Sequence, residues 1–326
     1  MTIKTKKILV TGGAGFIGSH LVDALLELGH EVLVIDDLST GKVENLENAV
    51  KYYPQKLKIE QCDITDSIVA QLVGLFKPEI IFHLAAQMNV RKSVEDPIFD
   101  ADKNIIGTIK LLESSIAHNV AKFIFSSTGG AIYGEQEFFP ATERHPTNPE
   151  SPYGISKRSA ELYLEYYSRV STLKCVSLRY GNVYGPRQNP KGEAGVVAIF
   201  CRNLIEHKPL KINGDGLQTR DYVNVADVVA ANLMFIEDSI INHYQCFNIG
   251  LGVETSVIDI VQSIKKAASS SDKKQLKVAC EVIHGEPAKG EQRRSSIDAT
   301  RIKQIGWQAK TSFDQGILQT LESFLP

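Results

Sequence analysis

A phenol and an ammonium lie four residues apart in the segment Tyr153-Gly154-Ile155-Ser156-Lys157. If Ser151-Pro152 opens a helix there, the Tyr153 and Lys157 side chains share one face of it. A free tyrosine has a pKa of about 10, and each unit of lowering requires about 1.4 kcal/mol. A lysine cation beside the ring could supply part of that energy, so the pair could remove a proton from an alcohol. The same spacing also occurs on ordinary helix surfaces.

Hydroxyl side chains follow the apolar run Phe123-Ile124-Phe125, in the segment Ser126-Ser127-Thr128. Side chains at the carboxyl end of a central parallel strand face the ligand crevice. Either Ser127 or Thr128 could therefore hydrogen-bond the reacting alcohol. The alternative is that these hydroxyls cap a turn.

A glycine-rich turn follows the first apolar run and opens an amphipathic helix, in the order Thr11-Gly12-Gly13-Ala14-Gly15-Phe16-Ile17-Gly18. Glycines allow a tight turn and a close backbone approach, so the amides of the helix N-terminus can hold a pyrophosphate. The second apolar run ends in Asp36-Asp37, about 20 residues on, where a carboxylate would bind the adenosine ribose and repel a 2′-phosphate. The arrangement favours NAD over NADP, whereas the alternative is a connector that binds nothing.

Two further segments follow strand-like runs. Asp63 could hydrogen-bond the adenine amino group, or it could cap a helix together with Thr65 or Asp66. The small residues of His83-Leu84-Ala85-Ala86 suit a close approach of a cofactor, although packing alone would also explain them.

Short apolar runs alternate with helical stretches as far as Val176, which predicts a doubly wound α/β domain with a parallel sheet. The runs are Ile8-Leu9-Val10, Val32-Leu33-Val34-Ile35, Leu57-Lys58-Ile59, Ile80-Ile81-Phe82, Phe123-Ile124-Phe125 and Val176-Ser177-Leu178. We expect a Rossmann-type NAD-binding domain over residues 1–180 and a smaller α/β substrate-binding lobe over 181–326. The segment 219–248, which reads as strand then helix, is expected to rejoin the first domain. Helices are predicted at 257–268 and 313–324, and an exposed polar loop at 269–274.

The composition is that of a globular protein of 326 residues with a formal net charge of −2. Such a charge gives no case for binding nucleic acid or an anionic membrane. The five cysteines form no metal-binding pattern, so we expect reduced, mostly buried thiols and no metal site. Without a signal-peptide pattern or an apolar run that could span a bilayer, the chain is expected to be cytoplasmic.

Taken together, five motifs resemble those of the extended short-chain dehydrogenases/reductases, in the NAD-dependent epimerase/dehydratase family, and most of all its UDP-glucose 4-epimerase group. They are TGGAGFIGSHL, HLAA, SSTGGAIYG, SPYGISK and RYGNVYGPRQNP. The resemblance implies NAD held by Gly12, Gly15, Phe16, Ile17, Gly18, Asp36, Asp37, Asp63, Ile64, Leu84, Ala85, Ala86, Asn104, Tyr153, Lys157 and Tyr180.

The same resemblance implies a set of substrate-binding residues. Asn182 and the helix start with Val196 and Val197 would contact the nucleotide diphosphate, Lys211 and Asn213 would lie around the uracil, and Arg220 would clamp a phosphate. The family often has a second arginine where this chain reads Ala288-Lys289-Gly290-Glu291. Lys289, Arg293 or Arg294 could replace it.

The implied reaction inverts C4 of a UDP-hexose such as UDP-glucose or UDP-galactose. Tyr153 would take the proton of the 4-hydroxyl while NAD takes the C4 hydride, and a 4-keto sugar would then be reduced on its other face. Ser295 matches the position that lines the pocket beside C2, and its small size leaves room for the acetamide of UDP-GlcNAc or UDP-GalNAc, unless it sits in an ordinary turn. A homodimer is implied through the helix of Tyr153 and the one from about Pro97 to His118.

Other activities remain as alternatives. Sugar 4,6-dehydratases share the tyrosine and lysine but follow the active-site threonine with Asp-Glu, and this chain has Gly129-Gly130 there. A decarboxylase, a reductase and a UDP-glucuronate 4-epimerase are the other enzymatic readings. A silent NAD-sensing protein would be expected to lose Tyr153 or Lys157, and both are present.

Overall fold

The computed structural model describes residues 4–191, 195–237, 243–276, 281–287 and 292–325. The chain divides into two compact units. The first unit contains residues 1–132, 147–179 and 229–247, and the second contains 133–146, 180–228 and 248–326. Within the described ranges, no helix has the length and apolar character needed to cross a membrane.

The first unit is built on a seven-stranded parallel sheet with the strand order β11-β6-β5-β4-β1-β2-β3, which confirms the doubly wound, Rossmann-type fold. Its strands are β1 (Lys7–Thr11), β2 (Glu31–Asp36), β3 (Leu57–Gln61), β4 (Ile80–His83), β5 (Lys122–Thr128), β6 (Lys174–Tyr180) and β11 (Gln245–Ile249). The order reverses between β1 and β4, and Thr11 pairs with His83 there. Ligands of such sheets bind outside the carboxyl ends of the strands at this reversal.

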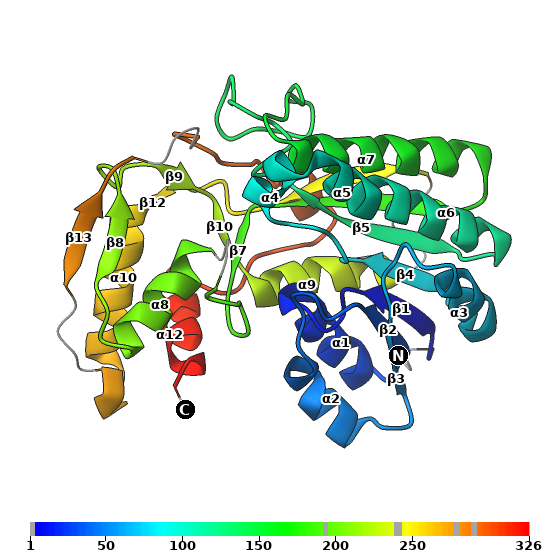
Figure 1. Ribbon diagram of the computed structural model, residues 1–326, viewed down its shortest axis with the longest axis horizontal. Helices are drawn as coiled ribbons and strands as arrows, with labels where there is room; N and C mark the ends of the chain where they lie inside the picture. Colours follow the sequence, from blue (N-terminus) through cyan, green and yellow to red (C-terminus); the bar gives the residue numbers. More distant parts are fainter. Residues whose placement is uncertain (1–3, 192–194, 238–242, 277–280, 288–291, 326) are drawn as a thin grey trace. The chain divides into compact units, whose positions relative to one another are not determined.

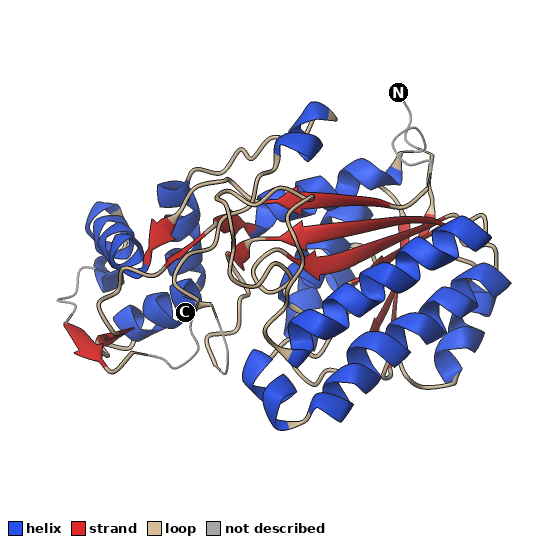
Figure 2. Ribbon diagram, turned by 90° about the horizontal axis from the view of Figure 1, so that it is seen from above, coloured by secondary structure: helices blue, strands red, loops and turns tan. Residues whose placement is uncertain are grey.

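Helices cover both faces of this sheet (Figure 1). They are α1 (Phe16–Glu27), α2 (Glu47–Tyr52), α3 (Ile68–Phe76), α4 (Val90–Glu95), α5 (Pro97–Ala101), α6 (Gly107–Ala117), α7 (Pro152–Val170) and α9 (Val225–Leu233), with short turns η1 (Val43–Leu46), η2 (Asp102–Ile106) and η3 (Met234–Ile236). On one face, helices lie along the sheet (Figure 2). Val73 of α3, Leu112 of α6 and Leu164 of α7 lie in one buried apolar cluster with residues of the strands. Because both faces are covered, the central strands β1, β2 and β4 are almost continuously apolar. The edge strand β3 differs, since Lys58, Glu60 and Gln61 are exposed.

The second unit packs three helices around an apolar core. Its elements are β7 (Asn182–Tyr184), α8 (Val196–Ile205), β8 (Leu210–Asn213), β9 (Thr219–Arg220), β10 (Tyr222–Asn224), β12 (Thr255–Ser256), α10 (Val257–Ser270), η4 (Lys274–Leu276), β13 (Val282–Gly285), α11 (Thr300–Gln304) and α12 (Phe313–Ser323). Phe200 of α8, Ile264 of α10 and Leu321 of α12 lie in one buried cluster.

The structure differs from the predicted boundaries in three places. Residues 133–146 lie in the second unit, where Ala141 bridges to Ile297. The return to the first unit begins at residue 229 and not near 219, because β9 pairs with β12 and β10 with β7 inside the second unit. The predicted loop 269–274 is partly wrong, since α10 continues to Ser270 and the hydroxyls of Ser269 and Ser270 bond back to helical carbonyls.

Candidate functional site

The glycine turn between β1 and α1 leaves no room for side chains. A Cβ on Gly18 would lie 2.1 Å from the Gly12 carbonyl oxygen, and a Cβ on Gly12 would lie 2.7 Å from the Ala85 nitrogen. Gly12 also has a φ of +69°, which disfavours any other residue. Gly15 caps α1 without a side-chain hydrogen bond, so the first amides of the helix at Phe16 and Ile17 keep the donors that a pyrophosphate accepts. This cradle fits a dinucleotide.

The two acidic residues after β2 occupy different environments. Asp36 is 6% exposed and accepts hydrogen bonds from the Ala14 and Leu38 amides, both at 2.9 Å. Burial raises the pKa of its carboxyl group, and these two amides oppose the shift. Asp37 is exposed and accepts from the Ser39 amide and hydroxyl. Asp36 is therefore the carboxylate that the fold holds against the glycine turn.

The ends of β3 and β4 complete this edge of the sheet. His83 is buried between the hydroxyls of Thr11, at 2.7 Å, and Thr108, at 3.0 Å. Burial, and then the charge of Lys157, lower the pKa of His83 to about 3, so its imidazole is neutral. Leu84, Ala85 and Ala86 follow it and are partly buried.

Asp63 lies after β3. Its carboxylate accepts from the Thr65 amide and hydroxyl and from Lys103 Nζ at 2.6 Å. Burial alone would raise the pKa of Asp63, but the hydrogen bonds from Lys103 and Thr65 lower it below its ordinary value. Asp63 does not cap a helix, since α3 begins at Ile68 after Ser67. Its neighbour Ile64 is buried against Gly107 of α6.

Tyr153 and Lys157 lie in the first turns of α7. Ser151 caps this helix by accepting from the Gly154 amide, and Pro152 occupies its first turn, as the sequence predicts. Lys157 Nζ donates to the Ser126 carbonyl oxygen at 2.8 Å and lies 6.0 Å from the centroid of the Tyr153 ring. The helix therefore holds the ammonium near the ring at the end of β5.

Burial shifts the pKa values of both groups. It lowers the pKa of Lys157 to about 8, against the opposing charges of Asp100 and Glu161. Burial, followed by the charge of Asp100, raises the pKa of Tyr153 well above its ordinary value. A phenolate at Tyr153 therefore needs positive charge nearby.

The two candidate hydroxyls on β5 differ in their contacts. Ser127 is buried and donates to Glu161 Oε1 at 2.7 Å. Glu161 is itself held by both Nε and the NH2 group of Arg179, at 2.9 and 2.6 Å. Thr128 is partly exposed and accepts from the Ala131 amide at 3.2 Å, which leaves its hydroxyl hydrogen available to a ligand.

Sequence reasoning missed a buried polar cluster beside α7. Asp100 of α5 accepts hydrogen bonds from Gln87, Asn104 and Ser156. Asn104, which the resemblance assigns to the cofactor, is 3% exposed and also bonds both backbone groups of Gln87. The only sequence signals were the spacing of Asp100 and Asn104 by one helical turn and the polar residue Ser156 inside the tyrosine motif.

The predicted substrate residues of the second unit lie on several elements. Asn182 opens β7, and Val196 and Val197 open α8, where Val197 is fully buried and offers only its backbone. Lys211 and Asn213 are the exposed, alternate residues of β8. Arg220, on β9, donates to the Thr219 carbonyl oxygen. Tyr180, which the resemblance assigns to the cofactor, is buried at the end of β6.

Ser295 and its neighbours follow an extended path. The Ser295 amide donates to the Thr219 carbonyl oxygen, and the residue is 3% exposed, so it does not sit in an ordinary surface turn. Arg293 pairs with both carboxylate oxygens of Asp215, and Arg294 pairs with Glu254 over the Phe139 ring. Both arginines thus have acidic partners, and Lys289 lies outside the described residues.

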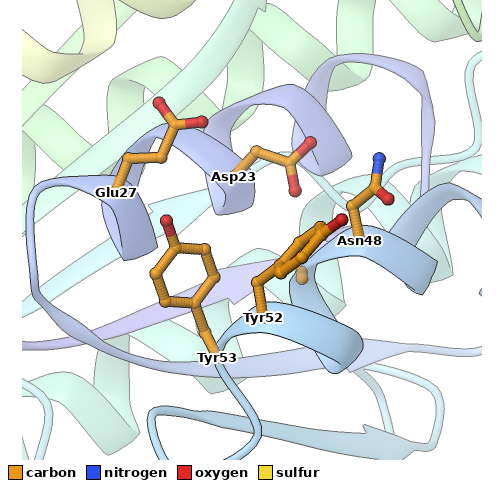
Figure 3. Close-up of a pocket in the computed structure, with 6 residues that line it drawn as sticks. Asp23, Glu27, Asn48, Tyr52 and Tyr53 are labelled. Carbon is orange, nitrogen blue, oxygen red and sulfur yellow. The ribbon is translucent and has the colours of Figure 1, made fainter.

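A separate hollow of about 190 Å³ lies between α1 and α2 (Figure 3). Its lining consists of Asp23, Glu27, Asn48, Ala49, Tyr52 and Tyr53. None of the residues predicted to bind the dinucleotide lines it. Carboxylates would repel a phosphate, so this hollow is not part of the nucleotide site.

The sheet, the glycine turn and the tyrosine–lysine pair at its carboxyl edge are those of a Rossmann-type, NAD-dependent enzyme. The family described as GDP-mannose 4,6 dehydratase matches residues 9–320. The chain therefore belongs to this family of NAD-dependent epimerases and dehydratases, as the motifs indicate.

Named relatives cover nearly the whole chain. A UDP-glucose 4-epimerase of Mycolicibacterium smegmatis is 44% identical over 319 residues, which are 98% of both proteins. The structure of a UDP-glucose 4-epimerase of Thermotoga maritima with UDP-glucose has 47% identity and a TM-score of 0.89, and covers 98% of each chain. A UDP-glucose 4-epimerase of Thermus thermophilus in complex with NAD has 40% identity and a TM-score of 0.87, with the same coverage.

Proposed function

We propose that this protein is an NAD-dependent isomerase that inverts C4 of a UDP-hexose, with UDP-glucose and UDP-galactose as its basic substrate pair. The observation that carries the proposal is the buried Lys157 ammonium held beside the Tyr153 ring at the end of β5. The similarity to UDP-glucose 4-epimerases over 98% of the chain supports the choice of reaction.

NAD is held at the carboxyl ends of the strands of the seven-stranded sheet. The Gly12–Gly18 turn and the N-terminal amides of α1 bind the pyrophosphate, Asp36 and Asp37 face the adenosine ribose, and Asp63 and Ile64 lie at the adenine. Leu84, Ala85, Ala86, Asn104 and Tyr180 border the nicotinamide half. When bound, NAD supplies the hydride acceptor and, while oxidised, a positive charge.

Tyr153 acts as the base that takes the proton of the 4-hydroxyl. Because its own surroundings raise its pKa, the Lys157 ammonium must offset them to stabilise the phenolate. Thr128 donates a hydrogen bond to the reacting oxygen, while Ser127 stays with Glu161 and holds β5 against α7. With bound NAD as the acceptor, the C4 hydride would leave the sugar as Tyr153 takes the proton, which would give a 4-keto sugar. Return of that hydride to the other face of C4, with the proton given back by Tyr153, would complete the inversion.

The second unit supplies the contacts to UDP. Asn182 and the amides of Val196 and Val197 bind the diphosphate, Lys211 and Asn213 bind the uracil, and Arg220 clamps a phosphate. Lys289 is the cation that we assign to the second phosphate contact, since Arg293 and Arg294 already pair with Asp215 and Glu254. Ser295 leaves room beside C2, so we also propose activity on UDP-GlcNAc and UDP-GalNAc.

Dehydration is not proposed, although the matching family carries that name. Elimination of water from the sugar needs an acid and a base after the active-site threonine, and Gly129 and Gly130 follow Thr128.

We further propose a homodimer in the cytoplasm. An apolar stripe of exposed side chains follows α7, formed by Ile155, Leu162, Tyr163, Tyr166 and Val170. Ile98 and Ile106 are exposed on the neighbouring α5 and η2. A second copy would cover these faces.

The described cysteines, Cys62, Cys175, Cys201 and Cys246, are free thiols, which suits a reducing compartment such as the cytoplasm.

One assay tests the reaction. Purified protein, without added NAD, is incubated separately with UDP-glucose, UDP-GlcNAc, UDP-glucuronate and their 4-epimers, and the products are resolved by chromatography. We expect UDP-glucose and UDP-galactose to interconvert. No NAD needs to be added, because the cofactor is regenerated in each cycle and stays bound. Formation of a 4-keto-6-deoxy sugar, or no conversion even with NAD added, would overturn the proposal.

A further inference from the structure

We propose that Asp100 is a positioning residue, which ties the loop after β4 to helix α7 and keeps a negative charge beside Tyr153 and Lys157. The inference rests on the proposed function, because it concerns the same site. Asp100 is fully buried in α5, which packs against α7. A buried carboxylate is costly unless its oxygens accept hydrogen bonds.

Both oxygens of Asp100 bind neutral donors. Oδ2 accepts from the Ser156 hydroxyl at 2.6 Å, and Ser156 lies between Tyr153 and Lys157 in α7. Oδ1 accepts from Gln87 Nε2 at 2.8 Å and from Asn104 Nδ2 at 3.0 Å. Within the described part of the chain, no cation binds Asp100 directly, so its charge acts on the surrounding groups.

Gln87 carries this connection into the loop that borders the cofactor. It directly follows Leu84-Ala85-Ala86, and its two backbone groups bond the Asn104 side chain at 2.9 and 2.8 Å. The Gln87 side-chain amide also donates to the Asn89 carbonyl oxygen and accepts from the Asn89 amide. One carboxylate therefore fixes both the loop and the helix that carries Tyr153.

The charges that face the tyrosine–lysine pair come from three elements. Asp100 comes from α5, and Glu161 from α7 is paired with Arg158 and Arg179. His83 comes from β4 and is neutral at ordinary pH. Among the described residues near the pair, Asp100 is thus the carboxylate that no cation contacts, and its charge raises the pKa of both Tyr153 and Lys157.

Removing that charge should shift both pKa values in one direction. Asp100→Asn keeps an oxygen for Gln87 and Asn104, and the Ser156 hydroxyl can accept from the new amide. Without the negative charge of Asp100, the pKa of the Tyr153 phenol and the pKa of the Lys157 ammonium both fall. Each limb of the pH profile that either group sets should therefore move to lower pH. The whole pH profile of kcat should shift to lower pH by about one pH unit.

The test compares three variants with the wild type. Asp100→Asn should slide the pH profile, whereas Asp100→Ala should also release NAD during gel filtration, because Gln87 and Asn104 lose their acceptor. Asp227→Asn is the matched control, since Asp227 is a buried carboxylate that accepts from the Lys310 and Thr311 amides in the second unit. It should lower stability without moving the pH profile.

A measurement independent of turnover separates this inference from the proposed function. The Lys157 ammonium can be titrated by NMR with isotope-labelled lysine, assigned with Lys157→Arg. Its pKa, about 8 in the wild type, should fall in Asp100→Asn. An unchanged Lys157 titration and a pH profile that coincides with the wild type would overturn the role of Asp100, whatever substrate the enzyme uses.

Discussion

The Tyr153 hydroxyl is the single group whose loss should stop the reaction. Tyr153→Phe removes one oxygen and keeps the ring, so the packing of the ring and the binding of NAD should persist. We expect kcat to fall at least 100-fold, the contribution usual for a positioned base. Product formation and NAD content after gel filtration, measured on the same preparation, check this. Retention of more than a few per cent of activity would remove Tyr153 from the role of base.

Asp36 should select NAD over NADP. Asp36→Ala removes a like charge from the neighbourhood of a 2′-phosphate, so the preference should relax. The change also leaves the Ala14 and Leu38 amides without their acceptor, at a cost of about 1–3 kcal/mol each. Asp36→Asn keeps an acceptor and should relax the preference at a smaller cost in stability.

Asp37→Ala is the companion variant for this cofactor test, because it shows which of the two carboxylates at the ribose carries the discrimination; Asp37 is exposed and bonded to Ser39. Dissociation constants of NAD and NADP, measured for the wild type and the Asp36 and Asp37 variants, show which carboxylate sets the preference. If only the Asp37 variant loses discrimination, the assignment of Asp36 is wrong.

Ser295 should set the width of the sugar pocket. In Ser295→Tyr, the larger ring fills the space that an acetamide needs, so turnover of UDP-GlcNAc should fall at least tenfold more than turnover of UDP-glucose. Steady-state kcat/KM values for both substrate pairs test this. Equal use of acetamido sugars by the variant, or no use of them by the wild type, would refute the pocket argument.

At the scale of elements, Lys122 joins strand β5 to the end of the short helix η3 by hydrogen bonds. It begins β5, is 2% exposed, and its Nζ donates to the carbonyls of Phe235, Ile236 and Glu237 at 3.1, 2.9 and 2.7 Å. Lys122→Met leaves these carbonyls without their donor, so the free energy of unfolding should fall by about 3 kcal/mol. Denaturant unfolding measures the change, and Lys51→Met, at an exposed lysine, should leave it within about 0.5 kcal/mol.

Elements whose signals are local could be predicted from the sequence. The start of α7 depends on Ser151 and Pro152, and the strands depend on short, mainly apolar runs, so both could be found without a structure. The extension of α10 through Ser269 and Ser270 was missed, because serines favour loops unless their hydroxyls bond back to the helix. The placement of 133–146 and the Asp100 cluster depend on partners distant in sequence, which no local pattern contains.

At the scale of the whole molecule, the apolar stripe on α7 should bind a second copy. Replacing Leu162 and Tyr166 together by Glu places charges where two apolar faces would meet, and we expect the species to shift from dimer to monomer. Sedimentation velocity over a range of concentrations measures this. Leu75→Glu is the control, because Leu75 is 82% exposed on α3 and lies outside the stripe. A monomeric wild type would refute the dimer.

The last strand of the large sheet comes late in the chain. β11 pairs with β6, yet residues 181–244 separate the two strands in sequence, and those up to 228 belong to the second unit. The ribosome releases the chain from its N-terminus, so β6 remains an open edge until residues 245–249 emerge. Pairing across such separations is slow, and an open edge can pair with other chains. Expression temperature and chaperone supply, more than final stability, should therefore limit the yield of folded protein from cells.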